Sequence, residues 1–138
     1  MPRVLAIDYG TKRVGLATTD PYGLIASAIG AVHAKDVIAY LKDYTTKEDV
    51  SCFVVGLPKR MDGSDSASTK HIEIFVNLLR KNFPDIPIER VDERFTSTIA
   101  TRSLLEMGLK KKDRAKKENI DQVSAVLILQ TYLEMKNN

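Results

Sequence analysis

The segment from Arg3 to Asp20 constrains the fold more than any other part of the chain. An apolar run over residues 3–9 contains a carboxylate, Asp8, near its end. A turn with Gly10 follows, and a second apolar run spans residues 13–19. Glycine is preferred in tight hairpin turns, so the pattern predicts two antiparallel strands. A carboxylate in an apolar strand is costly unless a metal ion, a bound hydroxyl group or backbone N–H groups compensate its charge. Asp8 is therefore the first candidate site residue.

The remaining composition is that of an ordinary globular protein. A chain of 138 residues can bury one core without disulfides, so we expect a single domain over residues 1–138. No stretch approaches the roughly 20 apolar residues of a membrane-spanning helix. Arg3 leads directly into the first strand, so we expect no secretion signal and a cytoplasmic location. Cys52, the single cysteine, lies among apolar residues and is expected to be a buried structural thiol.

Hydrophobic periodicity and turn residues predict the elements that follow the hairpin. They are a strand over residues 24–32 with a bulge at Gly30, a helix over 36–47, a strand over 52–56, a helix from Ser64 or Ser66 to about Asn82, a strand over 88–91, a helix from Thr96 or Ser97 to Gly108, and a helix from about Asn119 to Lys136. The order is a three-stranded antiparallel meander followed by alternating strands and helices. It predicts an α/β fold, a mixed sheet with helices on both faces.

Acidic residues lie where the central strands of such a sheet end. Glu93 follows the last expected strand, and Asp121 lies in the first turn of the last expected helix. Ligand sites in these sheets form at the carboxyl ends of the strands, so we expect Asp8, Glu93 and Asp121 to converge. Oxygen ligands favour Mg²⁺ or Mn²⁺ over zinc. Two such ions bridged by Asp8 would activate water and stabilise the leaving oxygen of a phosphodiester.

Each acid also has a structural interpretation. Asp8 would cap the hairpin turn, Glu93 would form a surface ion pair with Arg94, and Asp121 would stabilise a helix N-terminus. Glu118 lies three residues before Asp121 on the same helix face, and its simpler interpretation is a solvated side chain. The hypothesis of a metal site depends on these acids occurring together on these elements.

Basic residues accompany the acids. Residues 110–117 hold six bases and one acid. Such a run is usually a solvated loop, but beside an acidic metal site it suggests a polyanionic substrate. The candidate nucleic-acid contacts are Lys12, Arg13, Lys59, Arg60, Arg94, Lys110, Lys111, Lys112 and Arg114. A solvated turn explains Lys12 and Arg13 equally well.

Four segments of the chain resemble one known family. They are residues 6–15, Val55–Pro58 with Met61–Ser64, Asp92–Ser97, and Ile120–Asp121 with Ser124, Ala125, Ile128 and Leu129. The element order and the acids resemble the RNase H-like nuclease superfamily, and nearly the whole chain is similar to its YqgF/RuvX family. The resemblance implies an RNase H-like five-stranded sheet with strand order 3-2-1-4-5 and metal-dependent phosphodiester cleavage. It also implies that Asp8, Glu93 and Asp121 are the catalytic acids.

The resemblance also implies a biological role, and the chain differs from RuvC-type sites at one acidic position. The family is described as a nuclease that matures the 5′ end of pre-16S rRNA and, by likeness to RuvC, as a Holliday junction resolvase. The expected partner is structured RNA, or alternatively branched DNA, and the expected assembly is a monomer or a weak homodimer. RuvC-type sites carry a fourth acid where this chain has Ser124, so a second metal ion would need Asp92 or Glu118 instead.

Two other classes remain open. Residues 8–11 also resemble the first phosphate-binding hairpin of actin-like ATPases and sugar kinases. Those proteins need two such domains, and this chain has one hairpin of this type. The second alternative is a nucleic-acid-binding module with a weakened site, because Ser124 replaces the fourth acid.

Overall fold

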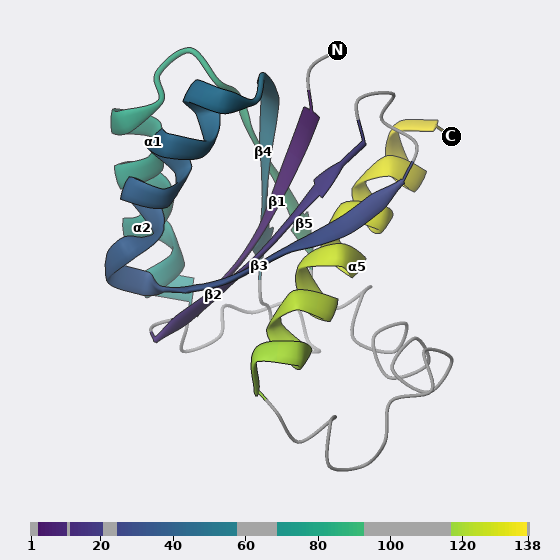
Figure 1. Ribbon diagram of the computed structural model, residues 1–138, viewed down its shortest axis with the longest axis horizontal. Coiled ribbons are helices and arrows are strands. Elements are labelled where there is room, and N and C mark those ends of the chain that lie inside the picture. Colours follow the sequence, from purple (N-terminus) through teal and green to yellow (C-terminus); the bar gives the residue numbers. More distant parts are fainter. Residues whose placement is uncertain (1–2, 11, 21–24, 58–68, 93–116, 138) are drawn as a thin grey trace.

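The computed structural model describes residues 3–10, 12–20, 25–57, 69–92 and 117–137, and the structural statements below refer to them (Figure 1). The elements in chain order are β1 (Arg3–Tyr9), β2 (Arg13–Thr19), β3 (Ala26–His33), the 3-10 helix η1 (Ala34–Asp36), α1 (Val37–Lys47), β4 (Val50–Leu57), α2 (Thr69–Asn82), β5 (Ile88–Asp92) and α5 (Lys117–Asn137). The strands form one mixed sheet in the order β3-β2-β1-β4-β5, which confirms the predicted order.

The first three strands form the predicted antiparallel meander. β1 pairs with β2, and β2 pairs with β3. The register of the second pair shifts, because Leu16 lies opposite Gly30 whereas Ala17 lies opposite Ala28. Ile29 is therefore the extra residue of a β-bulge, which confirms the bulge predicted at Gly30. β4 and β5 continue the sheet on the other side of β1 as parallel strands.

Several predicted boundaries differ from the observed ones. β4 begins at Val50 rather than Cys52, because Val50 pairs with Arg3 and the ladder continues beyond the apolar run. α1 begins one residue later than predicted, because residues 34–36 form a 3-10 turn. α5 is described from Lys117, so Asn119 lies inside the helix and is not its N-cap. The proposed caps Ser64 and Ser66, and the helix predicted from Thr96 or Ser97 to Gly108, lie outside the described residues.

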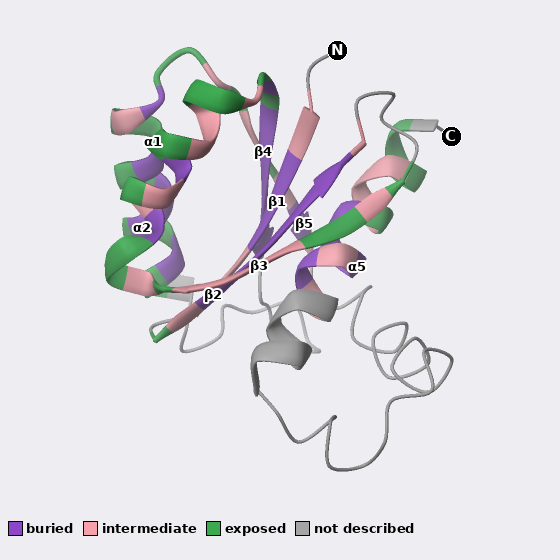
Figure 2. Cartoon of the chain, in the orientation of Figure 1, coloured by how far each residue is buried: buried purple, intermediate pink, exposed green. Residues whose placement is uncertain are grey.

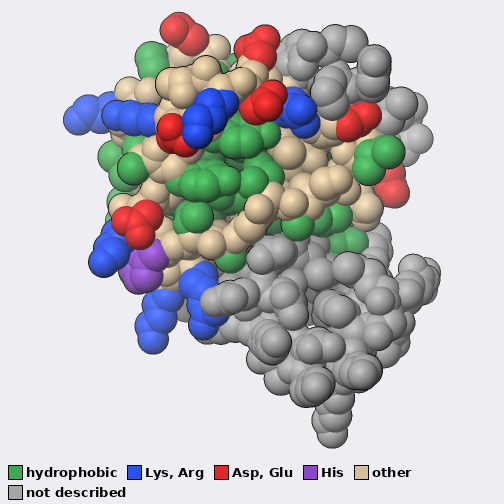
Figure 3. All heavy atoms as spheres, in the orientation of Figure 1, with side chains coloured by type: hydrophobic (Ala, Val, Ile, Leu, Met, Phe, Trp, Pro, Cys, Tyr) green, Lys and Arg blue, Asp and Glu red, His purple; other side chains and the backbone are tan. Residues whose placement is uncertain are grey.

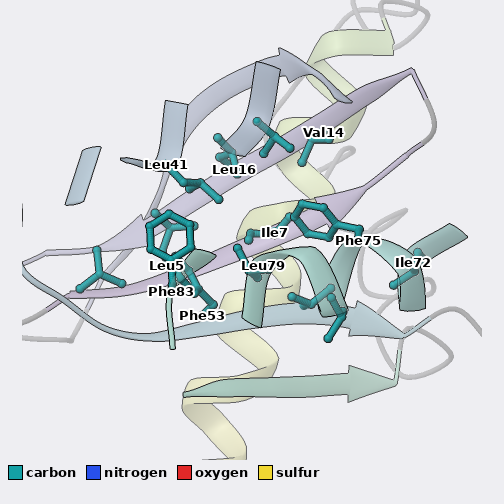
Figure 4. Packing of buried hydrophobic residues seen from close by; sticks show 14 residues of the cluster. Leu5, Ile7, Val14, Leu16, Leu41, Phe53, Ile72, Phe75, Leu79 and Phe83 are labelled. Carbon is teal, nitrogen blue, oxygen red and sulfur yellow. The ribbon is translucent and has the colours of Figure 1, made fainter. Parts of the chain in front are cut away.

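The face of the sheet under α1 and α2 is largely buried (Figure 2) and holds large apolar side chains (Figure 4). Its cluster consists of Leu5, Ile7, Val14, Leu16, Val37, Leu41, Val50, Phe53, Val55, Ile72, Phe75, Val76, Leu79 and Phe83. The rings of Phe53 and Phe83 meet edge to face with centroids 5.2 Å apart. Full burial of such a side chain contributes about 1.5–3 kcal/mol, so this cluster is the main source of stability.

The opposite face is covered by α5 and holds smaller side chains. Its cluster consists of Ala6, Ala17, Cys52, Val54, Val91, Ala125, Ile128 and Leu129. Successive residues of a strand point to opposite faces, which is why Leu5 and Ile7 belong to one cluster and Ala6 to the other. Protein interiors contain few voids, so small side chains let α5 lie close to the sheet. Among the described helices, none is both long and apolar enough to span a membrane.

Candidate active site

Asp8 lies near the end of the central strand β1, on the face covered by α5. It is two residues beyond Ala6, so strand alternation puts both side chains on the same face. Asp8 is half-buried, whereas Ala6 beneath α5 is fully buried. The carboxylate therefore lies at the margin of the smaller core, where that core opens toward the carboxyl edge of β1.

Glycines flank Asp8 on both neighbouring strands. Gly15 of β2 is its direct partner, and the pairing of Ile7 with Val55 puts Gly56 of β4 level with Asp8 on the other side. Both glycines are buried and neither carries a side chain, so only backbone atoms of β2 and β4 border the carboxylate on this face. A hard cation bound by oxygen ligands would fit beside such an acid. Gly56 entered the sequence analysis only as part of the Val55–Pro58 segment, because its position beside Asp8 depends on the pairing of β1 with β4.

The hairpin turn after Asp8 is tight, as predicted from Gly10. A Cβ atom added at Gly10 would lie 2.6 Å from the backbone oxygen of Arg13, closer than real side chains come. Any other residue at this position would force the turn to shift. Gly10 therefore fixes how β2 returns past the end of β1, and with it the placement of Gly15 beside Asp8.

The helix α5 brings its first turns to the same edge of the sheet (Figure 1). The Tyr132 hydroxyl lies 3.9 Å from the Cys52 sulfur, near the start of β4, so the later part of α5 covers the opposite edge. Asp121 precedes Tyr132 by about three helical turns, or about 16 Å. The distance along β4 from Cys52 to Gly56 is about 13 Å. Asp121 therefore stands about as far along α5 from the Tyr132–Cys52 contact as Gly56 stands along β4.

The position of Asp121 within its helix differs from the prediction. Because α5 is described from Lys117, Asp121 is its fifth residue and lies in the second turn. Stabilisation of an acid by the helix dipole falls off within the first turn, which weakens that structural explanation for Asp121. The Asp121 side chain itself, the Glu118 side chain and all of Glu93 lie outside the described residues.

Asp92 occupies the other face of the sheet. Val91 pairs with Gly56 and belongs to the cluster under α5, so the next residue, Asp92, falls on the α2 side. Arg90 shares that side, and its Nη1 atom lies 2.7 Å from Oε1 of Glu73 in α2. The strand register therefore argues against Asp92 as the replacement for the fourth acid at Ser124.

The described residues contain only part of the predicted metal site. Among them no group of three or more His, Cys, Asp and Glu side chains is arranged to hold a metal ion. Asp8 is the one proposed ligand whose side chain is described, and its half-buried position between two glycines fits a carboxylate ligand. Ser124 is half-buried in α5 and, one turn after Asp121, supplies no carboxylate.

Only some of the predicted nucleic-acid contacts lie among the described residues. Lys12 is exposed in the hairpin turn, and Arg13 is half-buried at the start of β2, opposite His33. Both lie at the edge of the sheet where β1 ends. The other candidates lie outside the described residues: Lys59, Arg60, Arg94, Lys110, Lys111, Lys112 and Arg114.

Cys52 lies at the opposite edge and is the buried structural thiol that was predicted. Burial raises the pKa of the Cys52 thiol, although its contact with the Tyr132 hydroxyl acts in the other direction. Burial also raises the pKa of Tyr132 to about 12, with smaller contributions from Cys52 and Glu89. A raised thiol pKa disfavours the nucleophilic thiolate, so this pair is part of the core rather than a reactive centre.

Sequence comparison finds relatives that match nearly the whole of this chain. A family model described as "RuvX: Holliday junction resolvase" matches residues 2–135. A protein of Flavobacterium psychrophilum is 51% identical over 136 residues, and one of Bacteroides thetaiotaomicron is 49% identical over 136 residues. Each alignment covers 99% of both chains, and both relatives carry the name "Putative pre-16S rRNA nuclease".

Comparison of structures finds the same fold in junction resolvases. RuvC of T. thermophilus, solved with a Holliday junction substrate, has a TM-score of 0.60 and 11% identity, covering 98% of this chain and 96% of that chain. The Fowlpox virus resolvase, solved with Holliday junction DNA, has a TM-score of 0.59 and 10% identity, covering 99% of both chains. With the matched family model and relatives, these findings show that the chain belongs to the RuvX (YqgF) family and has the RNase H-like fold of the resolvases.

Proposed function

We propose that the chain is a metal-dependent nuclease that processes the 5′ end of pre-16S rRNA in the cytoplasm. One structural observation supports this most: Asp8 is half-buried between Gly15 and Gly56, at the edge of the sheet to which α5 brings the backbone of Asp121. An acid at the carboxyl end of a central strand, with glycine on both neighbouring strands, is the arrangement that a ligand site in this kind of sheet needs. The names of the close relatives supply the substrate.

Asp8, Glu93 and Asp121 would hold Mg²⁺ or Mn²⁺ through carboxylate oxygens. The bound ion would supply Lewis acidity toward water and neutralise charge on the phosphodiester. The protein contributes the rest. Its rigid central strand fixes Asp8, and the glycines beside it let a phosphate backbone approach the sheet. Lys12, Arg13 and the basic residues predicted in loops attract the polyanionic substrate, which we expect to be structured RNA bound by a monomer or a weak homodimer.

A second candidate function is Holliday junction resolution, with branched DNA as substrate. The description of the matching family model favours it, because that description names a junction resolvase. A resolvase makes paired cuts and would act as a symmetric dimer, whereas a processing nuclease can act as a monomer. The choice of substrate therefore separates the two functions.

The test is a cleavage assay on labelled pre-16S rRNA 5′ fragments and on four-way DNA junctions, with Mg²⁺ or Mn²⁺. We expect cleavage of the RNA, and a loss of about 100-fold or more in Asp8→Asn, Glu93→Gln and Asp121→Asn, because each removes charge that stabilises the reacting centre. Asp85→Asn, an exposed acid before β5, is the matched control and should cleave normally. Each active-site variant should stay folded, and removing like charges can raise its melting temperature without metal.

The other outcomes select the alternatives. Cleavage that survives Asp8→Asn unchanged would show that the site is wrong. Binding of both substrates without cleavage would favour a binding module, and cleavage of junctions alone would favour the resolvase. Stabilisation of the protein by ATP would favour the ATPase-like interpretation of residues 8–11.

A further inference from the structure

We propose that the end of β3 extends the nucleic-acid surface beyond the hairpin turn, with His33 and Lys35 as phosphate contacts. Together with Lys12 and Arg13 they form a basic surface that we call the β2–β3 corner. This inference rests on the proposed nuclease function. It adds the direction in which the substrate strand leaves the site, which is across β2 toward β3.

Backbone pairing brings these four residues together, although they are far apart in sequence. Arg13 and His33 are direct partners in the antiparallel ladder of β2 and β3. The backbone N–H of Ala34 donates to the carbonyl oxygen of Lys12 at 3.0 Å, which fastens the start of η1 to the hairpin turn. Figure 3 shows basic side chains and a histidine gathered at the lower left, over the tip of β2 and the end of β3.

The strand register puts Arg13 and His33 on the same face as Asp8. Gly15 is the partner of Asp8, and Arg13 lies two residues before Gly15, so Arg13 shares that face. His33 is opposite Arg13 and shares it too. His33 is thus two strands across and two residues along from Asp8, a backbone separation of about 12 Å. A nucleic-acid strand advances about 3.4 Å per nucleotide along a duplex axis, so His33 lies only a few nucleotides from the candidate site.

The hydrogen bond that His33 accepts at Nδ1 leaves its other ring nitrogen, Nε2, as the hydrogen-bond donor. The backbone N–H of Lys35 donates to Nδ1 of His33 at 3.1 Å, so Nδ1 is an acceptor and carries no proton. In neutral imidazole the proton then resides on Nε2, which donates. His33 is exposed, and a phosphate oxygen is a suitable acceptor for this N–H group.

The charges of the corner favour a polyanion. Lys12 and Lys35 are exposed, Arg13 is half-buried, and Asp36 is the exposed acid next to Lys35. The two exposed lysines belong to a corner that lies beside the Asp8 face, so a phosphate backbone can contact the corner and the candidate site together.

The test measures binding of a fluorescently labelled pre-16S rRNA 5′ fragment by anisotropy, in EDTA so that no cleavage occurs. Lys35→Ala should bind three- to tenfold more weakly, and the slope of log affinity against log salt should fall by about 0.7–0.9, as expected for one lost phosphate contact. Lys81→Ala is the charge-matched control, because Lys81 is exposed near the end of α2, at the opposite edge of the sheet, and should bind normally.

A second pair of variants tests the histidine. His33→Asn keeps a side-chain oxygen that can accept the Lys35 N–H, so η1 should remain intact while binding weakens two- to threefold. His71→Asn is the matched control on α2, on the other face of the sheet, and should bind normally. If Lys35→Ala binds like Lys81→Ala and His33→Asn like His71→Asn, the inference is wrong. Failure of the proposed nuclease is recognised separately, because RNA binding without cleavage by the unaltered chain would overturn the nuclease and leave this inference standing. Absence of RNA binding by the unaltered chain would overturn both.

Discussion

The two faces of the sheet are built from the same strands but differ in side-chain size. Under α1 and α2 the buried residues are mainly large, with Phe53, Leu5 and Leu79 fully buried. Under α5 they are mainly small, and the row that contains Asp8 has glycine on both neighbouring strands. The difference indicates a division of roles. One face supplies stability through apolar burial, and the other lets a helix lie close to the sheet and has glycine on both sides of an acid.

Alternation makes this division possible within a single strand. β1 contributes Leu5 and Ile7 to the large cluster, and Ala6 and Asp8 to the other face. A substitution can therefore affect one face with little effect on its neighbour in sequence. Three predictions test the two faces of the sheet separately, from the largest expected effect to the smallest.

Loss of a large side chain under α1 and α2 should cost the most stability. Phe53→Ala removes a fully buried ring that packs against Phe83, so we expect the free energy of unfolding to fall by about 3–5 kcal/mol. Ile74→Ala, at a side chain that is 60% exposed, is the control and should change stability by about 0.5 kcal/mol or less. Urea denaturation measures both, and equal effects would contradict the assignment of stability to this face.

Added volume under α5 should disturb the site as well as the fold. Ala6→Leu inserts a large side chain between β1 and α5, at a residue with no exposed surface, and should cost about 1–3 kcal/mol. Under the proposed active site it should also lower the cleavage rate, because displacing α5 would shift the backbone of Asp121 relative to Asp8. Leu5→Met is the control on the opposite face, where a change that conserves volume should cost less than about 1.5 kcal/mol and leave cleavage unchanged. Normal cleavage by folded Ala6→Leu would show that the spacing of α5 is not critical.

The smallest expected effect is a loss of stability at alkaline pH from Cys52 and Tyr132. Burial raises the pKa of both groups in the folded protein, that of Tyr132 to about 12. The folded state therefore keeps these protons at a pH at which the unfolded chain has lost them. Their stabilising contribution is complete below the unfolded pKa values and declines as pH rises above about 8.5, where an unfolded cysteine titrates.

The measurement is the urea midpoint at pH 7.5 and at pH 10 for the unaltered chain and for Cys52→Ala. The variant should lose less stability over this interval because it lacks one of the two groups. In the native protein, Cys52 should also react slowly with a thiol reagent at pH 8 and rapidly in urea. Rapid reaction in the native state would contradict the burial of this thiol.

Local patterns were sufficient to predict most of the fold. The boundaries of β1 and β2 were predicted to the residue, and the bulge at Gly30 was predicted from one glycine. Strand alternation and helical periodicity are short-range signals, so a sequence shows them without knowledge of the partners. The start of β4 was missed because Val50 joins the sheet through its pairing with Arg3, a contact that no local pattern contains.

The candidate site was predictable only in part, for the same reason. Asp8 is conspicuous in its own segment, because a charge interrupts an apolar strand. The role of Gly56 depends on the parallel pairing of β1 and β4, and the unsuitability of Asp92 depends on the register of β5. Both are properties of strand pairs rather than of segments. Glu93 and the Asp121 side chain remain predictions, since they lie outside the described residues.

The sequence alone determined which strands form, that Asp8 is costly without a compensating partner, and that helices cover both faces, because residue type and spacing act locally. Only the tertiary structure decided which residues meet. It put glycine on both sides of Asp8, separated Asp92 from that face, and joined His33 and Ala34 to the hairpin turn. Strand register makes these decisions, since a shift of one residue would move every side chain of a strand to the opposite face.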